Sequence, residues 1–184
     1  MSRSGIDPAS AFGVADADFD DPFGILEACH ERIARQLAVL DRLPAHLAAR
    51  GVDDEARTAI ARIRRYFDVA GPDHHADEET DLFPAVREAA RDDAALLAEV
   101  DRLERDHVGM VAAWAALRAN LDALCDGRAA LDVPLASRFA ALYRDHVERE
   151  ERVVYGGAKP LLGAPLRARL ARAMVARRRR DDPT

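Results

Sequence analysis

The feature that most constrains this chain is a set of histidines on the apolar faces of four helical stretches. Helical core positions recur every three or four residues, so each apolar stripe can be followed along the sequence. One histidine interrupts each stripe, and a glutamate one turn later interrupts two of them again. The interrupting residues are His30, His74 with Glu78, His107, and His146 with Glu150. Such groups are costly to bury unless something compensates them.

The breakers between the stretches predict an all-α fold. Helices are expected at about 22–49, 54–90, 93–125 and 133–155, with glycines at or just beyond three of their ends. We therefore predict an up-down antiparallel four-helix bundle. Gly71-Pro72 and Pro84 are expected to kink or interrupt the second helix.

The ends of the chain predict two appendages to this bundle. Residues 1–21 are rich in Asp, Gly, Ser and Ala without a helical period, and a mobile acidic leader is expected there. The bundle itself is assigned to residues 22–158. Residues 159–184 are expected to add a C-terminal helix at 164–180 that caps the bundle and ends in a solvated basic run, Arg177 to Arg180.

Composition excludes several classes of function. The 27 Lys and Arg residues against 33 Asp and Glu give a formal charge of −6, which argues against nucleic acid or an anionic membrane as the main partner. The N-terminus lacks a signal-peptide pattern, and no stretch approaches the roughly 18 uninterrupted apolar residues of a membrane span. A cytoplasmic protein is expected. Cys29 and Cys125 form neither a zinc-finger pattern nor a disulfide framework.

The spacing of the interrupting residues predicts that they meet in one layer. His74 and His107 stand 17 and 16 residues from a turn near residue 91, which makes them level in an antiparallel pair. His and Glu at i, i+4 lie above one another on a helix face. Imidazole and carboxylate are ligands that iron, manganese and zinc accept, and a pair of divalent cations would compensate the buried charge.

An internal repeat supports a two-fold arrangement of these residues. The segment Phe67–Phe83 aligns without gaps on Phe139–Tyr155 at an offset of 72 residues. His74 falls on His146 and Glu78 on Glu150 in this alignment. Two similar helical hairpins are therefore expected, each with one HxxxE pair and one lone histidine.

Two other ligand assignments compete with this one. His75 and Glu79 have the same spacing as His74 and Glu78 but follow a polar line, so His75 is expected beside the ligands or exposed. Glu27 and Glu104 each precede a histidine by three residues, as in the ExxH motifs of ferritin-like di-iron bundles. That second set leaves His74 and His146 unexplained. It also places the ExxH motifs on the first and third helices, whereas ferritin-like bundles carry them on the second and fourth.

The segments CHERI, HHADEETDLFP, LERDH and HVEREERVVYG, in this order on successive helices, resemble the hemerythrin-like HHE cation-binding family over residues 22–156. The resemblance implies an up-down bundle around two non-haem iron ions with carboxylate and oxo or hydroxo bridges, zinc or manganese being alternatives. It makes Glu78 and Glu150 the bridges and four histidines the terminal ligands: His30, His74, His107 and His146. Oxygen-carrying hemerythrins have an HxxxH motif on the third helix, and Val111 occupies the position of its second histidine here. The ligand set therefore looks closer to that of di-iron proteins in nitric-oxide responses and iron-sulfur repair.

Three hypotheses about function follow from this reading. The first is a binding protein whose di-iron centre senses, scavenges or stores, with a diatomic molecule or peroxide as partner. The second is an oxidoreductase that turns over peroxide, nitric oxide or oxygen, with Tyr66 or Tyr143 as proton or electron donor. The third is a metal-stabilised structural module that binds a protein through its surface or through Arg177 to Arg180. No nucleic-acid or membrane partner is expected, and a homodimer stays open.

Overall fold

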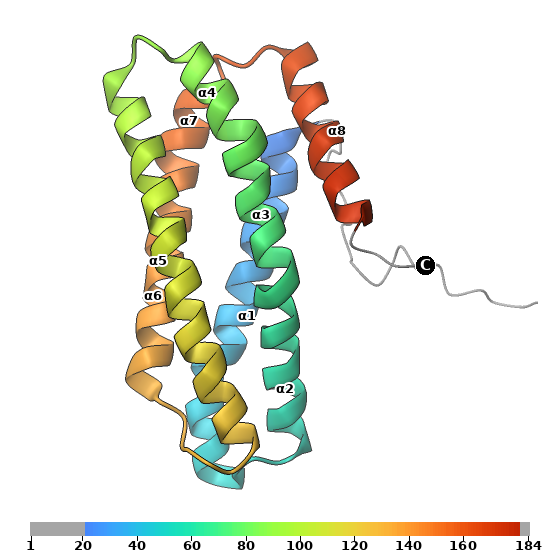
Figure 1. Ribbon diagram of the computed structural model, residues 1–184, viewed down its shortest axis with the longest axis vertical. Coiled ribbons are helices and arrows are strands. Elements are labelled where there is room, and N and C mark those ends of the chain that lie inside the picture. Colours follow the sequence, from blue (N-terminus) through green and yellow to red (C-terminus); the bar gives the residue numbers. More distant parts are fainter. Residues whose placement is uncertain (1–20, 181–184) are drawn as a thin grey trace, which may run out of the picture.

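A computed structural model describes residues 21–180, so most of the expected leader lies outside the described residues. Within that range the chain is all-helical, which confirms the predicted bundle with an additional C-terminal helix (Figure 1). Four helical columns form the bundle and α8 follows them. The elements are α1 Pro22–Arg50; α2 Asp54–Arg65, η2 Tyr66–Ala70, α3 Gly71–Asp77, η3 Glu78–Leu82 and α4 Phe83–Ala89; α5 Ala94–Cys125; α6 Val133–Arg149, η4 Glu150–Tyr155 and α7 Gly156–Ala158; and α8 Ala164–Arg180.

Aspartates set where each of the four columns begins. The side chains of Asp21, Asp53, Asp93 and Asp132 each accept a hydrogen bond from a backbone N–H of the first turn. Gly51 and Gly127, which follow the first and third columns, have φ angles of 71° and 69°. Glycine adopts this left-handed region without steric cost, so the chain can turn sharply there.

The second column stays helical throughout, and its α-helical pattern is interrupted near both prolines, as the sequence predicted. The π-helical turns η2 and η3 directly precede the turns that contain Pro72 and Pro84. Proline lacks an N–H and its ring clashes with the carbonyl four residues back, and a wider turn relieves both problems. The fourth column also runs on through Gly156 and Gly157 to Ala158, beyond its predicted end at the two glycines.

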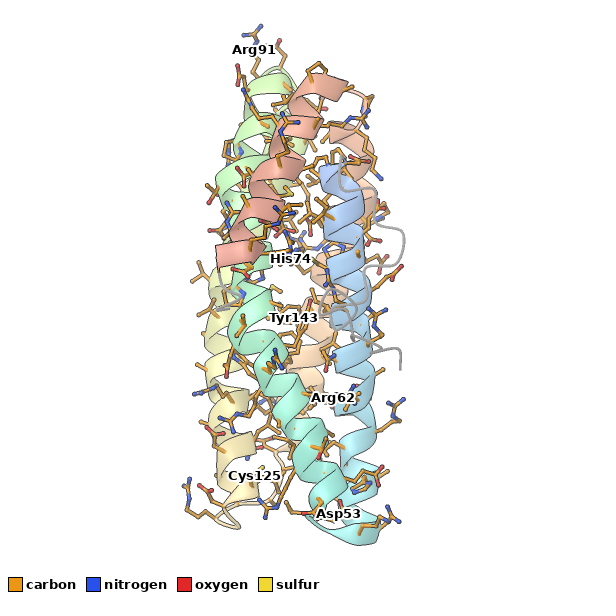
Figure 2. The ribbon with its side chains drawn as sticks, turned by 90° about the vertical axis from the view of Figure 1, so that its right-hand side faces the viewer. Asp53, Arg62, His74, Arg91, Cys125 and Tyr143 are labelled. Carbon is orange, nitrogen blue, oxygen red and sulfur yellow. The ribbon has the colours of Figure 1, made fainter. Side chains whose placement is uncertain are left out.

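Two hydrophobic cores lie along the bundle with a polar layer between them. The upper core includes Phe23, Phe83 and Tyr155, and the lower core includes Ile33, Phe67 and Phe139. The histidines and glutamates that interrupt the apolar stripes lie between these clusters, near the level of His74 in Figure 2. The cores hold the columns together on both sides of the layer and so fix the positions of its side chains.

Helix α8 packs on α1, α3 and η3 and extends the upper core with Leu170, Ala171 and Met174. Arg179 of its basic end is exposed as the sequence predicted, whereas Arg177 and Arg178 are not solvated. Arg177 forms ion pairs with Asp77 and Asp81, and Arg178 forms one with Asp77. The buried carboxylate of Asp77 draws both guanidinium groups onto the bundle.

Helix α5 is, among the described helices, the one long and apolar enough by composition to cross a membrane. The core helix of a helical bundle passes the same test. Here α5 packs against α6, η4, α4 and α2 and brings His107 into the polar layer. Of the apolar window that meets this criterion, 28% is buried inside the bundle.

Candidate metal centre

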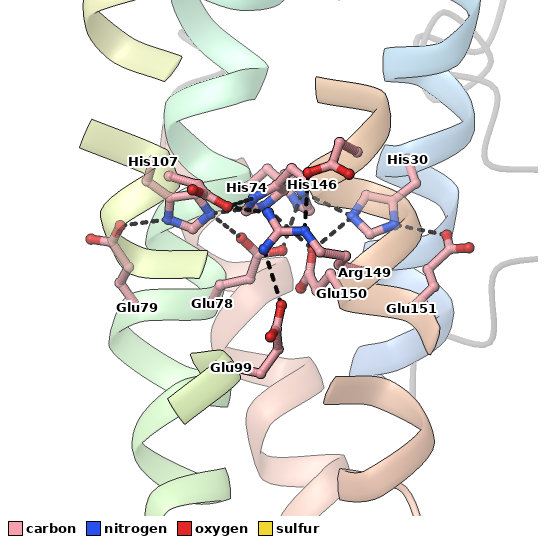
Figure 3. Close-up of polar contacts among 12 residues, drawn as sticks. His30, His74, Glu78, Glu79, Glu99, His107, His146, Arg149, Glu150 and Glu151 are labelled. Atoms are coloured by element: carbon pink, nitrogen blue, oxygen red, sulfur yellow. Dashed lines mark hydrogen bonds and ion pairs between the residues drawn. The ribbon is translucent and has the colours of Figure 1, made fainter. Parts of the chain in front are cut away.

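The polar layer brings together all six residues singled out by the sequence. Each of the four bundle columns contributes one histidine, and η3 and η4 begin with the two glutamates (Figure 3). All six side chains are at most 3% exposed. They are His30, His74, Glu78, His107, His146 and Glu150.

The four histidines form two pairs. The Nε2 atoms of His30 and His74 are 3.2 Å apart, and those of His107 and His146 are 3.1 Å apart. Two nitrogens that each lie about 2.0–2.1 Å from one cation, at angles between 90° and tetrahedral, are separated by roughly 3.0–3.4 Å. The spacing within each pair is therefore the spacing expected of two ligands to one ion.

Glu78 spans the two histidine pairs. Its Oε1 lies 3.2 Å from His74 Nε2 and its Oε2 lies 3.3 Å from His107 Nε2. Glu150 approaches both pairs through one oxygen, Oε2, which is 3.2 Å from His30 Nε2 and 3.7 Å from His146 Nε2. Two carboxylates that each reach both pairs give the layer the arrangement of a two-cation site.

A second ring of carboxylates orients the histidines from outside. Glu151 Oε1 is 2.8 Å from His30 Nδ1, and Glu79 Oε1 is 2.7 Å from His107 Nδ1. An ionised carboxylate only accepts hydrogen bonds, so the Nδ1–H of each ring must donate. In a neutral ring this leaves Nε2 with its lone pair directed inward, which is the tautomer that a metal ligand requires.

The roles of Glu79 and Glu151 were not recognised in the sequence, although a signal was present. Both follow a candidate bridging glutamate directly, and the 72-residue repeat places one on the other. The expectation could not go further because a side chain next to a core position points away from its own helix's core face. Only the neighbouring columns show that each carboxylate meets a histidine of another helix.

The unpaired atoms of the layer fit a cation. Both carboxylate oxygens of Glu78 and of Glu150 are buried and accept no hydrogen bond from the described residues. The Nδ1 atoms of His74 and His146 are buried without a hydrogen bond as well. Buried carboxylates without donors are costly, and divalent cations relieve that cost directly. The residues present therefore suit a bound metal.

Comparison with known proteins agrees with this geometry. Residues 21–158 match the model of the hemerythrin HHE cation-binding domain. The chain belongs to this family. A relative from Haemophilus influenzae, which carries the name "Uncharacterized protein", is 31% identical over 163 residues, covering 88% of this chain and 92% of that protein. This relative extends the family relationship and names no activity.

The electrostatics of the HHE layer act in opposite directions on its imidazoles without a cation. Burial and the neighbouring imidazoles lower the pKa of His74 well below its ordinary value. Burial likewise lowers the pKa of His146 to about 4. Burial also opposes charge on His30, but contacts with Glu150 and Glu151 outweigh it and raise that pKa to about 9. Burial and the charge of Glu150 raise the pKa of Glu78 well above its ordinary value.

The structure places the competing residues outside the ligand layer of this HHE domain. The carboxylate of Glu27 pairs with Lys159 at 2.6 Å, and that of Glu104 pairs with Arg87 at 2.8 Å, both at the surface. The ferritin-like assignment is therefore wrong for this chain. His75 is buried, not exposed, and stacks on the ring of His107 with centroids 3.9 Å apart.

Of the two tyrosines considered as donors, Tyr143 is buried in the lower core near the layer, and Tyr66 is turned away from it. The Tyr66 hydroxyl donates to the backbone oxygen of Cys29 at 3.1 Å, away from the carboxylates of the layer. Tyr143 lies below the layer, where its ring faces His75 at 6.4 Å between centroids. Tyr155 instead stacks on His30 at 5.7 Å, and its fully buried hydroxyl has a pKa raised well above 10 by burial and by the charges of Glu150 and Glu78.

Proposed function

We propose that this HHE domain is a non-haem di-iron protein that binds or reacts with a small molecule such as oxygen, nitric oxide or peroxide. Its terminal ligands are His30 and His74 for one iron and His107 and His146 for the other. Glu78 and Glu150 bridge the two ions. The observation that carries the proposal is the position of Glu78, whose two carboxylate oxygens face different histidine pairs.

The ligand types favour iron over a purely structural ion. Imidazole and carboxylate together suit ferrous and ferric iron, while zinc in structural sites is usually closed by four protein ligands. Six side chains shared between two ions leave coordination positions open. When bound, an iron pair supplies redox equivalents and Lewis acidity at those positions. The protein contributes orientation through Glu79 and Glu151 and a surrounding apolar shell that limits water.

Metal content tests the proposal. The protein is purified anaerobically, loaded with ferrous iron, and exposed to air while its near-ultraviolet and visible spectrum is recorded. We expect about two irons per chain and new charge-transfer absorption. His74→Ala and Glu150→Ala should each lose iron, while Glu88→Ala on the exposed face of α4 should not. Unchanged iron content in the first two variants would refute the assignment.

The buried hydroxyl of Tyr155 favours turnover as the second candidate function. The Tyr155 ring stacks on His30 at 5.7 Å, and the raised pKa of its hydroxyl keeps the proton in place beside the layer as a hydrogen-bond donor. Steady-state assays with nitric oxide, peroxide and oxygen test this alternative. Multiple turnovers in the wild type, with a lower rate in Tyr155→Phe, would support an oxidoreductase. A single turnover with all three molecules would refute this alternative. The cytoplasmic location and the small-molecule partner remain predictions.

A further inference from the structure

A cleft of about 290 Å³ runs along the seam between α1 and α6 and ends at the metal layer. His30 forms its inner end, together with the Glu151 carboxylate that accepts from His30 Nδ1. Among the six layer residues, His30 is the one that lines this cleft. The seam therefore connects the outside of the bundle with one of the two histidine pairs.

The walls of the cleft restrict what can pass. Ile33, Ala34 and Leu37 line it from α1, and Val147 and Tyr143 line it from α6. Glu148 and Glu151 add negative charge, which opposes anions, while Arg144 of the same lining is paired with Asp41. The apolar side chains of this open cleft suit small uncharged molecules better than ions.

The matching seam on the other side of the bundle is closed by a side chain. Val147 falls on His75 in the 72-residue repeat. The imidazole of His75 lies flat against His107, with the ring planes 9° apart and the centroids 3.9 Å apart. Phe83 stacks on the same ring at 6.0 Å between centroids. Tyr155 stacks on His30 in the same way at 5.7 Å, so His75 is the ring that covers His107 and has no counterpart on His30.

We propose that the cleft between α1 and α6 is the access route of a small uncharged diatomic molecule, which reaches the metal centre from the His30 side only. This inference rests on the proposed function for its biological meaning. Ala34 and Val147 set the width of the route, and His75 closes the equivalent route on the other side. The two histidine pairs would therefore differ in access while matching in ligand type.

The two seams supply a matched pair of variants. Aligning His30 with His107 also pairs Ile33 with Met110, Leu37 with Trp114, and Ala34 with Val111. Ala34 and Val111 are both exposed, so a tryptophan at either position leaves the core intact. Ala34→Trp should fill the cleft. Val111→Trp places the same ring on the seam that His75 already closes.

Xenon tests the cleft without any redox chemistry. Crystals of the zinc-loaded protein under xenon pressure should show the gas beside His30 in the wild type and in Val111→Trp, and not in Ala34→Trp. His75→Val, which copies Val147 into the other half, should admit xenon beside His107. A wild-type cleft without xenon would overturn the route, and His75→Val without a second xenon site would overturn the role of His75.

The association rate of nitric oxide with the ferrous-loaded protein tests the route itself. We expect Ala34→Trp to slow association by roughly tenfold or more and Val111→Trp to leave it within about twofold of the wild type. Equal rates in all three proteins would overturn the proposal. Metal content is measured on the same samples. A chain that takes up no metal refutes the proposed function, and the xenon experiment, repeated on crystals of the metal-free protein, still decides whether the cleft admits a gas.

Discussion

The two halves of the histidine–glutamate layer each bury a charged side chain, and the two charges are opposite. The residue before each candidate bridging glutamate is buried and charged: Asp77 before Glu78 and Arg149 before Glu150. Asp77 is held by Arg177 and Arg178 of α8. Arg149 is held by Asp106 and by Glu99, the latter at 3.0 Å, both from α5. The 72-residue repeat places Asp77 and Arg149 at the same position.

The difference shows why the chain needs its fifth helix. Helix α5 already stands beside Arg149, so the bundle alone completes that half. In the other half the neighbouring column is α1, which offers Cys29 where α5 offers Asp106 when His30 is aligned with His107. Arg178 bridges this gap, since it pairs with Asp77 and its Nη2 also donates to Cys29 Sγ at 3.3 Å. One half is thus completed within the bundle and the other by α8.

The largest effect is expected from removing the α8 arginines. In Arg177→Ala/Arg178→Ala the fully buried carboxylate of Asp77 loses its ion pairs. Breaking a buried ion pair by removing one side costs about 3–5 kcal/mol, because the remaining charge is uncompensated. The free energy of unfolding, measured by urea denaturation near pH 8, should fall by that amount.

Two variants sharpen this prediction. Adding Asp77→Asn to the double variant removes the stranded charge and should restore at least half of the lost stability. Arg149→Met should cost less, about 1–3 kcal/mol, because its acidic partners retain more contact with water. Equal losses in the two halves would contradict the claim that α8 compensates the more deeply buried charge.

A change of pH should alter the unfolding free energy through Asp77 but not through Arg149, by slightly less than the loss of the arginines. Burial raises the pKa of Asp77 from 3.8 to about 6, against the opposing charges of Arg178 and Arg177. Below pH 3.8 the carboxyl is protonated in both the folded and the unfolded chain. Between pH 3.8 and about 6 the folded chain binds more protons than the unfolded chain. The free energy of unfolding therefore falls as pH rises through this range. The full shift corresponds to about 3 kcal/mol.

The measurement compares metal-free wild type with Asp77→Asn across this pH range. The wild type should lose about 3 kcal/mol of unfolding free energy relative to the variant as the carboxyl ionises. Arg149 contributes no such slope because a guanidinium stays charged throughout. Parallel stability curves for the two proteins would show that Asp77 does not ionise from a raised pKa.

The smallest effect is expected from removing Glu79 or Glu151, and the loss of metal affinity should be the same in the two halves. Glu79→Ala and Glu151→Ala each remove the acceptor of a histidine Nδ1–H, and both side chains are 46% exposed, so the fold should tolerate the change. Loss of such an outer partner typically weakens metal binding by about ten- to hundredfold. Competition with a chromophoric zinc chelator measures the affinity, with Glu88→Ala as the control. A loss in one half only would break the two-fold description of the centre.

The sequence by itself determined the bundle and the layer. A histidine on each apolar stripe, two glutamates one turn on, and matching distances from the turns place six side chains at one height, because helical geometry relates residue number to position. It also distinguished His74 and Glu78 from His75 and Glu79, since only the former continue the line of Phe67. These inferences need only the period of the helix.

Tertiary structure decided everything that depends on the distance between columns. It showed that Glu79 and Glu151 contact histidines of other helices, that Glu27 and Glu104 pair with surface cations, and that Tyr155 stacks on His30. It also showed that Arg177 and Arg178, at the basic end of α8, pair with Asp77. Such contacts depend on how each helix is rotated and which neighbour it faces. The period of a single helix fixes its own buried face and carries no information about which side chain of a neighbouring column meets it.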